Sequence, residues 1–286
     1  MTGARVEAVG VLTGWGEGVD ALPVDARTAA AGRAVIPLAR PSLDGERFRR
    51  ATRECLLGVA AVDAMLRDGG LERQAIRGGG TGLVFVTAAA YGASNAEFVG
   101  AGAARSAAGA EGGLTEDRRG SVGTLHFPYT APSVLPGEVA IEFGLTGAYV
   151  ILIGGATATV DGLWQAARLL ADARCERVLV LAVETFVECE PLWRRARWTL
   201  PGPLVESAAC ALLGPGATAP AYRTGASSGD LERAAEARAG RTLACAPLVA
   251  LALARVAGGG TARLSGTWRG RTAAIDLVTA GRPARV

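Results

Sequence analysis

The residues that could do chemistry in this sequence are few. The chain of 286 residues has one histidine, His126, and all 30 of its basic residues are arginine. A single histidine excludes every triad, proton relay or metal site that needs two within this polypeptide. The missing lysine excludes a Schiff base and a P-loop. His126 lies in LHFPYTAP, where a packed structural role is the simpler interpretation; an acid–base role stays open but needs an unidentified carboxylate partner.

The five cysteines show no spacing typical of a metal or redox site. Their number is odd and none forms a C-x-x-C pair, which argues against a disulfide framework and a zinc site. Those at positions 55, 210 and 245 lie in apolar patterns and are expected to be buried thiols, and Cys175 precedes a strand. Cys189 lies between Glu188 and Glu190, whose charges disfavour a thiolate. That glutamate pair could serve as acid and base, although a solvated acidic loop explains it more simply.

Glycine-rich and arginine-rich stretches offer weaker signals. GGGTG at 78–82 precedes a strand instead of following one, and GGATAT at 154–159 lacks a third glycine, so both are interpreted as tight turns. Arg194, Arg195 and Arg197 stand between two tryptophans and could meet an acidic partner or a phosphate; a solvated surface is equally consistent. A net charge of +3 gives no nucleic-acid footprint. The apolar runs are too short or interrupted for a membrane span, and a reduced cytoplasmic location is expected.

Hydrophobic periodicity predicts an α/β fold. Strands are predicted at 5–12, 82–86, 149–153, 177–183 and 204–214, with 149–153 buried. Helices are predicted at 46–67, stopping at Gly69-Gly70, after Pro136 and Gly137, after the strand 149–153, near 230–239 and at 243–258. A closing hairpin turns at Arg269-Gly270. Strands alternating with helices indicate helices on both faces of the sheet.

The segment YVILIGGATAT poses the central question. It predicts a strand, a tight turn and a helix, which is the arrangement in which many α/β enzymes present a nucleophile. The turn itself is Gly154-Gly155-Ala156-Thr157, with no cysteine, lysine or serine–histidine pair.

Residues 125–184 resemble the N-terminal half of β-ketoacyl synthases, a family with the thiolase fold. The resemblance rests on Gly144-Leu145-Thr146-Gly147, the strand 149–153, the turn and Val183-Glu184. The opening VEAVGVLTG and the end of the chain, from GRTLACAP to AAIDLV, resemble the family's opening strand and closing helix and hairpin. This implies a layered α-β-α-β-α fold, with a ketosynthase-like N-terminal half at 1–214 and an abbreviated C-terminal half at 215–286.

The resemblance also implies that the catalytic groups are missing. Counting from Gly147 places the family's acyl-accepting cysteine at Ala156, and a methyl group forms no thioester. The family's two later histidines have no counterpart, because no histidine follows His126. This combination resembles the chain length factor of type II polyketide synthases, in the reduced form found beside polyene-forming synthases. Such a subunit implies an active ketosynthase partner in a heterodimer or heterotetramer, an acyl carrier protein, and neither cofactor nor metal.

The resemblance assigns two groups of residues to the partner interface. The first lines the acyl tunnel and comprises Tyr91, Ser94, Asn95, Phe98, Phe127, Tyr129, Thr130, Gly155, Ala156 and Thr157. For Phe98 an ordinary core position is an equal alternative. The second is the strand that would pair with its equivalent in the partner and thereby cover an apolar edge: Tyr149, Val150, Ile151, Leu152 and Ile153.

Two other functions remain open at this point. The chain could be an acyl-carrier-protein-dependent decarboxylase or acyltransferase that uses Thr157 or Cys189 as its reactive group. It could also be a stand-alone protein that binds an acyl chain and catalyses nothing.

Overall fold

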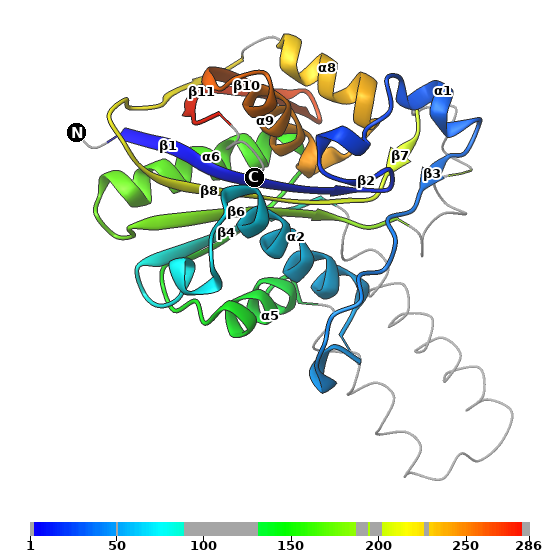
Figure 1. Cartoon of the computed structure of the whole chain (residues 1–286). Coiled ribbons are helices and arrows are strands. Elements are labelled where there is room, and N and C mark those ends of the chain that lie inside the picture. The colour runs from blue at the N-terminus through cyan, green and yellow to red at the C-terminus, as the bar shows by residue number, and fades with distance from the viewer. Residues whose placement is uncertain are drawn as a thin grey trace, which may run out of the picture.

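One large mixed sheet runs through the part of the chain that the structure describes (Figure 1). The computed structural model describes residues 3–49, 51–88, 131–186, 194, 202–225 and 229–281. Within them the sheet has nine strands, in the order β10-β11-β1-β8-β6-β4-β5, with β2 beside β1 and β9 beside β11. The strands are β1 (Gly3–Thr13), β2 (Gly16–Glu17), β4 (Thr81–Thr87), β5 (Tyr149–Ile153), β6 (Arg177–Glu184), β8 (Ser207–Gly216), β9 (Ala221–Thr224), β10 (Gly260–Trp268) and β11 (Arg271–Thr279). A small second sheet pairs β3 (Val35–Ile36) with β7 (Leu204–Val205).

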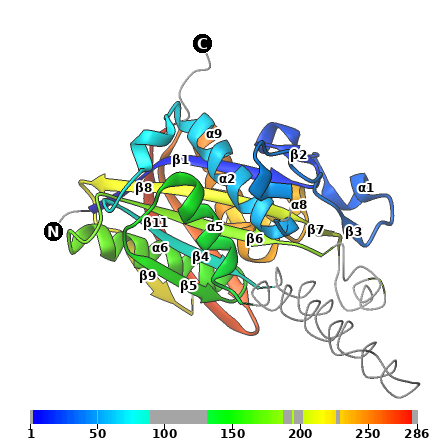
Figure 2. The same ribbon diagram turned by 90° about the horizontal axis from the view of Figure 1, so that it is seen from below.

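Helices cover both faces of this sheet, as the sequence predicts. Alternate residues of β4 show why: Leu83 and Phe85 belong to the core on one face, and Val84 and Val86 to the core on the other. The first core is filled from α2 (Arg53–Gly69) and α5 (Val134–Phe143), which lie in front of the sheet in Figure 2. The second is filled from α6 (Ala156–Ala171) and α9 (Ala246–Val256). The shorter elements are α1 (Ala26–Ala30), α8 (Asp230–Ala239) and the 3₁₀ turns η1 (Val19–Ala21), η2 (Glu46–Arg49), η3 (Arg73–Ile76) and η6 (Leu243–Cys245).

The sheet curls around α6. One side of this helix packs on β4 and β6, and another side packs on β10 and β11, which belong to the end of the same sheet. The layers are therefore α2 with α5, the centre of the sheet, α6 with α9, and the curled hairpin β10–β11. The α/β layering predicted from sequence is confirmed, and its second β-layer is a continuation of the first sheet.

Two predicted helices have different limits in the structure. The segment 46–67 is not one helix: η2 ends at Arg49 and α2 begins at Arg53, because Thr52 is extended (φ −67°, ψ 160°). The predicted stop is confirmed, since Gly70 caps α2 in the left-handed conformation (φ 61°). Helix α5 begins at Val134, earlier than predicted. Pro136 lies in its first turn, where the N–H that proline lacks has no helical acceptor.

Three strands also differ from the prediction. The segment 204–214 divides at Glu206 into β7 and β8, which enter different sheets. The short strand β9 lies in a region predicted to be polar and irregular apart from its helix. The strand β5 is not buried, because within the described residues it pairs only with β4 and forms the edge of the sheet. The division of the chain at residue 214 stays a prediction.

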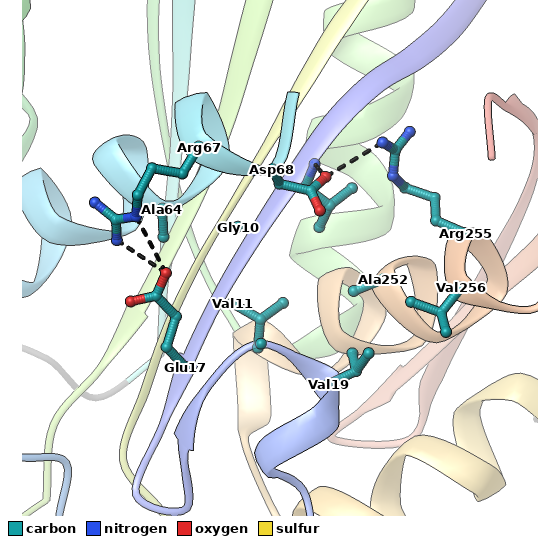
Figure 3. Close-up of a pocket in the computed structure, with 12 residues that line it drawn as sticks. Gly10, Val11, Glu17, Val19, Ala64, Arg67, Asp68, Ala252, Arg255 and Val256 are labelled. Carbon is teal, nitrogen blue, oxygen red and sulfur yellow. Dashed lines mark hydrogen bonds and ion pairs between the residues drawn. The ribbon is translucent and has the colours of Figure 1, made fainter. Parts of the chain in front are cut away.

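A buried ion pair joins helix α9 to helix α2 beside β1 (Figure 3). Arg255 is 2% exposed, and its Nη2 lies 3.2 Å from Oδ2 of Asp68. The same carboxylate oxygen accepts a hydrogen bond from the amide of Val9 at 3.0 Å, and Nη1 of Arg255 donates to the carbonyl of Ala280 at 2.9 Å. A pocket beside this ion pair is lined by Asp68 and Arg255 and by a second pair, Glu17 and Arg67. Because these charged groups are already paired with each other, we assign them a structural role. No helix among the described residues is both long and apolar enough to cross a membrane.

We predict that Arg255→Ala lowers the free energy of unfolding by about 3–5 kcal/mol, because it removes a buried charge from its partner. The neighbouring surface pair provides the control: Arg67 and Glu17 are 59% and 53% exposed, so Arg67→Ala should cost less than about 1 kcal/mol. Urea unfolding of both variants measures the two values. Equal losses would contradict the structural role of Arg255.

Candidate functional site

The strand, turn and helix predicted at 149–171 form the elbow at one end of the sheet. Strand β5 ends at Ile153, and the amide of Gly154 donates to the carbonyl of Thr87 at 2.8 Å. Helix α6 begins at Ala156, with Gly155 as its N-cap. The residue predicted to replace a nucleophile is therefore the first residue of a helix that directly follows a strand.

The hairpin β10–β11 packs so closely against this elbow that no side chain fits between them at two points. A Cβ placed on Gly155 would lie 2.2 Å from Cε3 of Trp268. A Cβ placed on Gly266 would lie 2.4 Å from the carbonyl carbon and oxygen of Ala156. Real Cβ atoms do not approach other atoms so closely, so glycine is required on both sides of this contact. Ala156 itself is 6% exposed.

The hydroxyl of Thr157 fastens the elbow to both strands of the hairpin. It is buried, and Oγ1 lies 3.2 Å from the carbonyl oxygen of Gly266 on β10 and 3.2 Å from that of Arg271 on β11. Both are hydrogen-bond acceptors, and neither can take up a proton as a base. Since a threonine nucleophile needs an adjacent base, the contacts of this hydroxyl favour a structural role over the reactive one considered for Thr157.

The turn of the hairpin is tight and places its aromatic residue over the elbow. Arg269 (φ 49°) and Gly270 (φ 78°) are both left-handed, as in the two-residue turns that match the twist of a hairpin. The predicted hairpin is confirmed. The guanidinium carbon of Arg269 lies 5.8 Å from the centroid of the Trp268 ring, within reach of a cation–π contact.

Two buried carboxylates at the strand ends are held by backbone amides. Glu184, at the end of β6, accepts hydrogen bonds from the amides of Ala88 at 2.7 Å and Ala244 at 3.2 Å. Glu206 accepts from the amides of Leu38 at 2.9 Å and Phe186 at 2.8 Å. It also pairs with the guanidinium of Arg53 at 2.5 Å. Both glutamates are fully buried, and their hydrogen bonds join segments that are distant in the sequence, so we assign them a structural role.

The thiols that the structure describes are unreactive by their surroundings. Cys55, Cys175, Cys210 and Cys245 are all buried and unpaired, which confirms the expectation for 55, 210 and 245. Burial raises the pKa of Cys55 to about 12, and burial raises the pKa of Cys210 and of Cys245 as well. In the described parts of the chain no group of histidine, cysteine and carboxylate side chains is arranged to hold a metal.

Among the described residues no strand lies beyond β5, so its outer edge is open there and carries apolar side chains. Tyr149 is 45% exposed and Ile153 is 67% exposed. The carbonyl of Ala148 accepts from Leu83 of β4, and the amide of Gly154 donates to β4. Because the direction of backbone groups alternates along a strand, the odd-numbered residues Tyr149, Ile151 and Ile153 direct their N–H and C=O groups to the open side.

The predicted site residues divide into two sets. Gly155, Ala156 and Thr157 come together with Gly266 and Trp268, two hairpin residues that sequence reasoning did not single out. A glycine inside the strand pattern TARLSGTW was the available signal, since such a glycine often marks a close backbone approach. His126, Cys189, the glutamates beside it and two of the three clustered arginines lie outside the described residues. The remaining tunnel residues also lie outside them: Tyr91, Ser94, Asn95, Phe98, Phe127, Tyr129 and Thr130.

Comparisons with known proteins agree with the predicted fold. The family model described as "Beta-ketoacyl synthase, N-terminal domain" matches residues 31–200. The ishigamide ketosynthase/chain length factor is similar in structure with a TM-score of 0.66 and 16% identity, covering 98% of this chain and 100% of that one. A type II PKS acyl-carrier protein in complex with its ketosynthase has a TM-score of 0.71 and 13% identity, covering 97% of this chain and 99% of that one. A β-ketoacyl synthase from Burkholderia phymatum has a TM-score of 0.65 and 13% identity, covering 97% of this chain and 100% of that one.

No curated protein sequence matches this chain. At these identities the structural similarities show the fold alone. They confirm the thiolase-like ketosynthase fold that the sequence predicts.

We predict that Gly155→Ala destabilises the protein by about 1–3 kcal/mol or more, because its methyl group would overlap the Trp268 ring. Gly137→Ala in α5 is the matched control: nothing lies within 4 Å of its Cβ position, so it should be neutral or stabilising by about 0.5–1 kcal/mol. Thermal unfolding measures both. A Gly155→Ala variant as stable as the parent protein would show that the hairpin does not pack on the elbow as described.

Proposed function

This chain belongs to the family of the β-ketoacyl synthase N-terminal domain, and from that premise we propose that it is a non-catalytic chain length factor. In this role it pairs with an active ketosynthase and forms one side of the acyl tunnel at the interface, in type II polyketide biosynthesis. The partner carries the cysteine and receives substrate from an acyl carrier protein.

The observation that carries this proposal is the alanine at the start of α6. Ala156 begins α6, and the resemblance aligns it with the family's acyl-accepting cysteine; its methyl group has no chemistry for acyl transfer. The only other group with a reactive heteroatom in the turn, the Thr157 hydroxyl, is engaged by two carbonyl oxygens. The single histidine of the chain leaves no imidazole pair for decarboxylation and condensation. These facts favour a non-catalytic role over a decarboxylase or acyltransferase that uses Thr157.

The open edge of β5 supports pairing with a second subunit. An uncovered edge with exposed apolar side chains favours association, and Tyr149 and Ile153 supply such side chains here. A partner strand laid along β5 would satisfy the outward backbone groups of Tyr149, Ile151 and Ile153 and remove both side chains from water. The five residues Tyr149–Ile153 are therefore the proposed dimer strand.

The proposed tunnel would limit chain length by the space that it leaves. Each added two-carbon unit gains about 1.6 kcal/mol by burying two methylenes at roughly 0.8 kcal/mol each. Where a side chain closes the tunnel, overpacking costs about 1–3 kcal/mol, and the balance changes sign. We propose that Tyr91, Phe98 and Tyr129 contribute to this limit together with Ser94, Asn95, Phe127 and Thr130.

The similar structures support the kind of complex proposed. One is described as a ketosynthase/chain length factor and another as an acyl-carrier protein in complex with its ketosynthase. We propose the same two partners for this chain, a polyene-type product and a cytoplasmic location.

We predict a one-to-one complex with a full-length ketosynthase that carries the elbow cysteine and is encoded beside this chain. Ile153→Arg should raise the dissociation constant at least tenfold, equivalent to about 1.4 kcal/mol, because it places a charge on the proposed dimer strand. Val24→Arg is the control, since Val24 is 93% exposed and lies away from β5, between η1 and α1. Native mass spectrometry and titration measure both.

Two results would contradict the pairing. One is a stable monomer that ignores the ketosynthase at every concentration tested. The other is a complex that Ile153→Arg and Val24→Arg leave equally tight.

A further inference from the structure

The contact between Trp268 and the elbow has a consequence that is independent of which residue stands at 156. Three atoms of the indole ring lie 2.2–3.0 Å from the position that a Cβ on Gly155 would take, so the space beside the N-cap of α6 is occupied from within the same chain. In an acyl-enzyme, this is where a thioester carbonyl and the first atoms of an acyl chain would have to fit. We propose that Trp268 is a built-in plug that keeps acyl groups out of this elbow.

Three contacts hold the plug in place. The backbone of Gly266 on β10 packs against the carbonyl group of Ala156, and there is no room for a side chain between them. The Thr157 hydroxyl lies within hydrogen-bond distance of the carbonyl oxygens of Gly266 on β10 and Arg271 on β11, and it shares its one hydrogen between them. The tight turn at Arg269-Gly270 leaves little slack between Trp268 and Arg271, which are paired across the hairpin.

The two ends of the hairpin are also fixed. Strand β11 pairs with β1 in the main sheet, and the core beneath α6 includes Leu264 of β10 and Ile275 of β11. The backbone at Trp268 is therefore held beside the start of α6, and the indole stays next to the elbow. Two features thus prevent acylation of the elbow: it has no thiol, and the indole ring occupies the space beside it. Restoring the thiol alone leaves that space occupied.

The reactivity of a cysteine introduced at the elbow tests this inference. In a Cys189→Ser background the four remaining cysteines are buried, so Ala156→Cys supplies the thiol to be followed. Modification by iodoacetamide is measured by intact mass under native conditions, with the Cys189→Ser protein as the blank. We expect Ala156→Cys to react at least ten times more slowly than Ala156→Cys/Trp268→Ala.

A matched control separates plugging from general loosening. Trp164 is a tryptophan of α6 itself, and its ring stacks on that of Tyr222 with the ring centroids 5.5 Å apart. Ala156→Cys/Trp164→Ala should stay as slow as Ala156→Cys alone. Equal rates for Ala156→Cys with and without Trp268 would overturn the proposal, and so would equal acceleration by Trp164→Ala.

A second measurement covers the case in which the double variant does not fold. Trp268→Leu keeps a large apolar side chain in the hairpin but uncovers part of the elbow. Hydrogen exchange of the amides at 155–158 should then be at least ten times faster than in the parent protein, with α2 unchanged; unchanged exchange at the elbow would overturn the proposal. None of these outcomes depends on the ketosynthase partner, so the plug and the proposed function can fail separately.

Discussion

The enclosure of helix α6 by a curled sheet is the constraint on which the rest of this structure depends. The helix packs on the central strands with one side and on the hairpin β10–β11 with another. Both surfaces belong to one continuous sheet, so the hairpin must approach the start of the helix at backbone distance. That approach is possible because Gly155 and Gly266 carry no side chain at the two points of contact.

Buried polar groups in the elbow and at the strand ends also hold the scaffold together. The carboxylates of Glu184 and Glu206 are buried at strand ends and receive backbone N–H groups from distant segments. The Thr157 hydroxyl joins α6 to the hairpin. Each of these groups stabilises the scaffold, and none of them is arranged as a nucleophile with a base beside it. A ketosynthase-like scaffold of this kind supports the proposed role, in which the shape of the chain acts on a reaction carried out by a partner.

Much of the fold was predictable because its signals are local. Continuous apolar runs predicted β4 and β6, helical periodicity predicted α6 and α9, and Arg269-Gly270 predicted the hairpin turn. The errors have tertiary causes. The apolar run of β5 predicted a buried strand, but the order of strands among the described residues places it at an edge, and composition alone does not distinguish an apolar edge strand from a buried one.

The site was predictable only in part. The turn at 154–157 and its missing nucleophile follow from the order of residues along the chain. The role of Trp268 does not, because its contact with Gly155 joins segments more than a hundred residues apart and depends on how strongly the sheet curls. A glycine within β10 hinted at close packing but did not indicate against what.

We propose that this chain shapes an acyl condensation without ever carrying the acyl group. The most direct measurement is the intact mass of both subunits after a mixture of this chain, its ketosynthase and acyl-loaded carrier protein is stopped during turnover. We predict a covalent acyl adduct on the ketosynthase alone, with the mass of this chain unchanged. An acyl adduct on this chain that forms and disappears with turnover would contradict it.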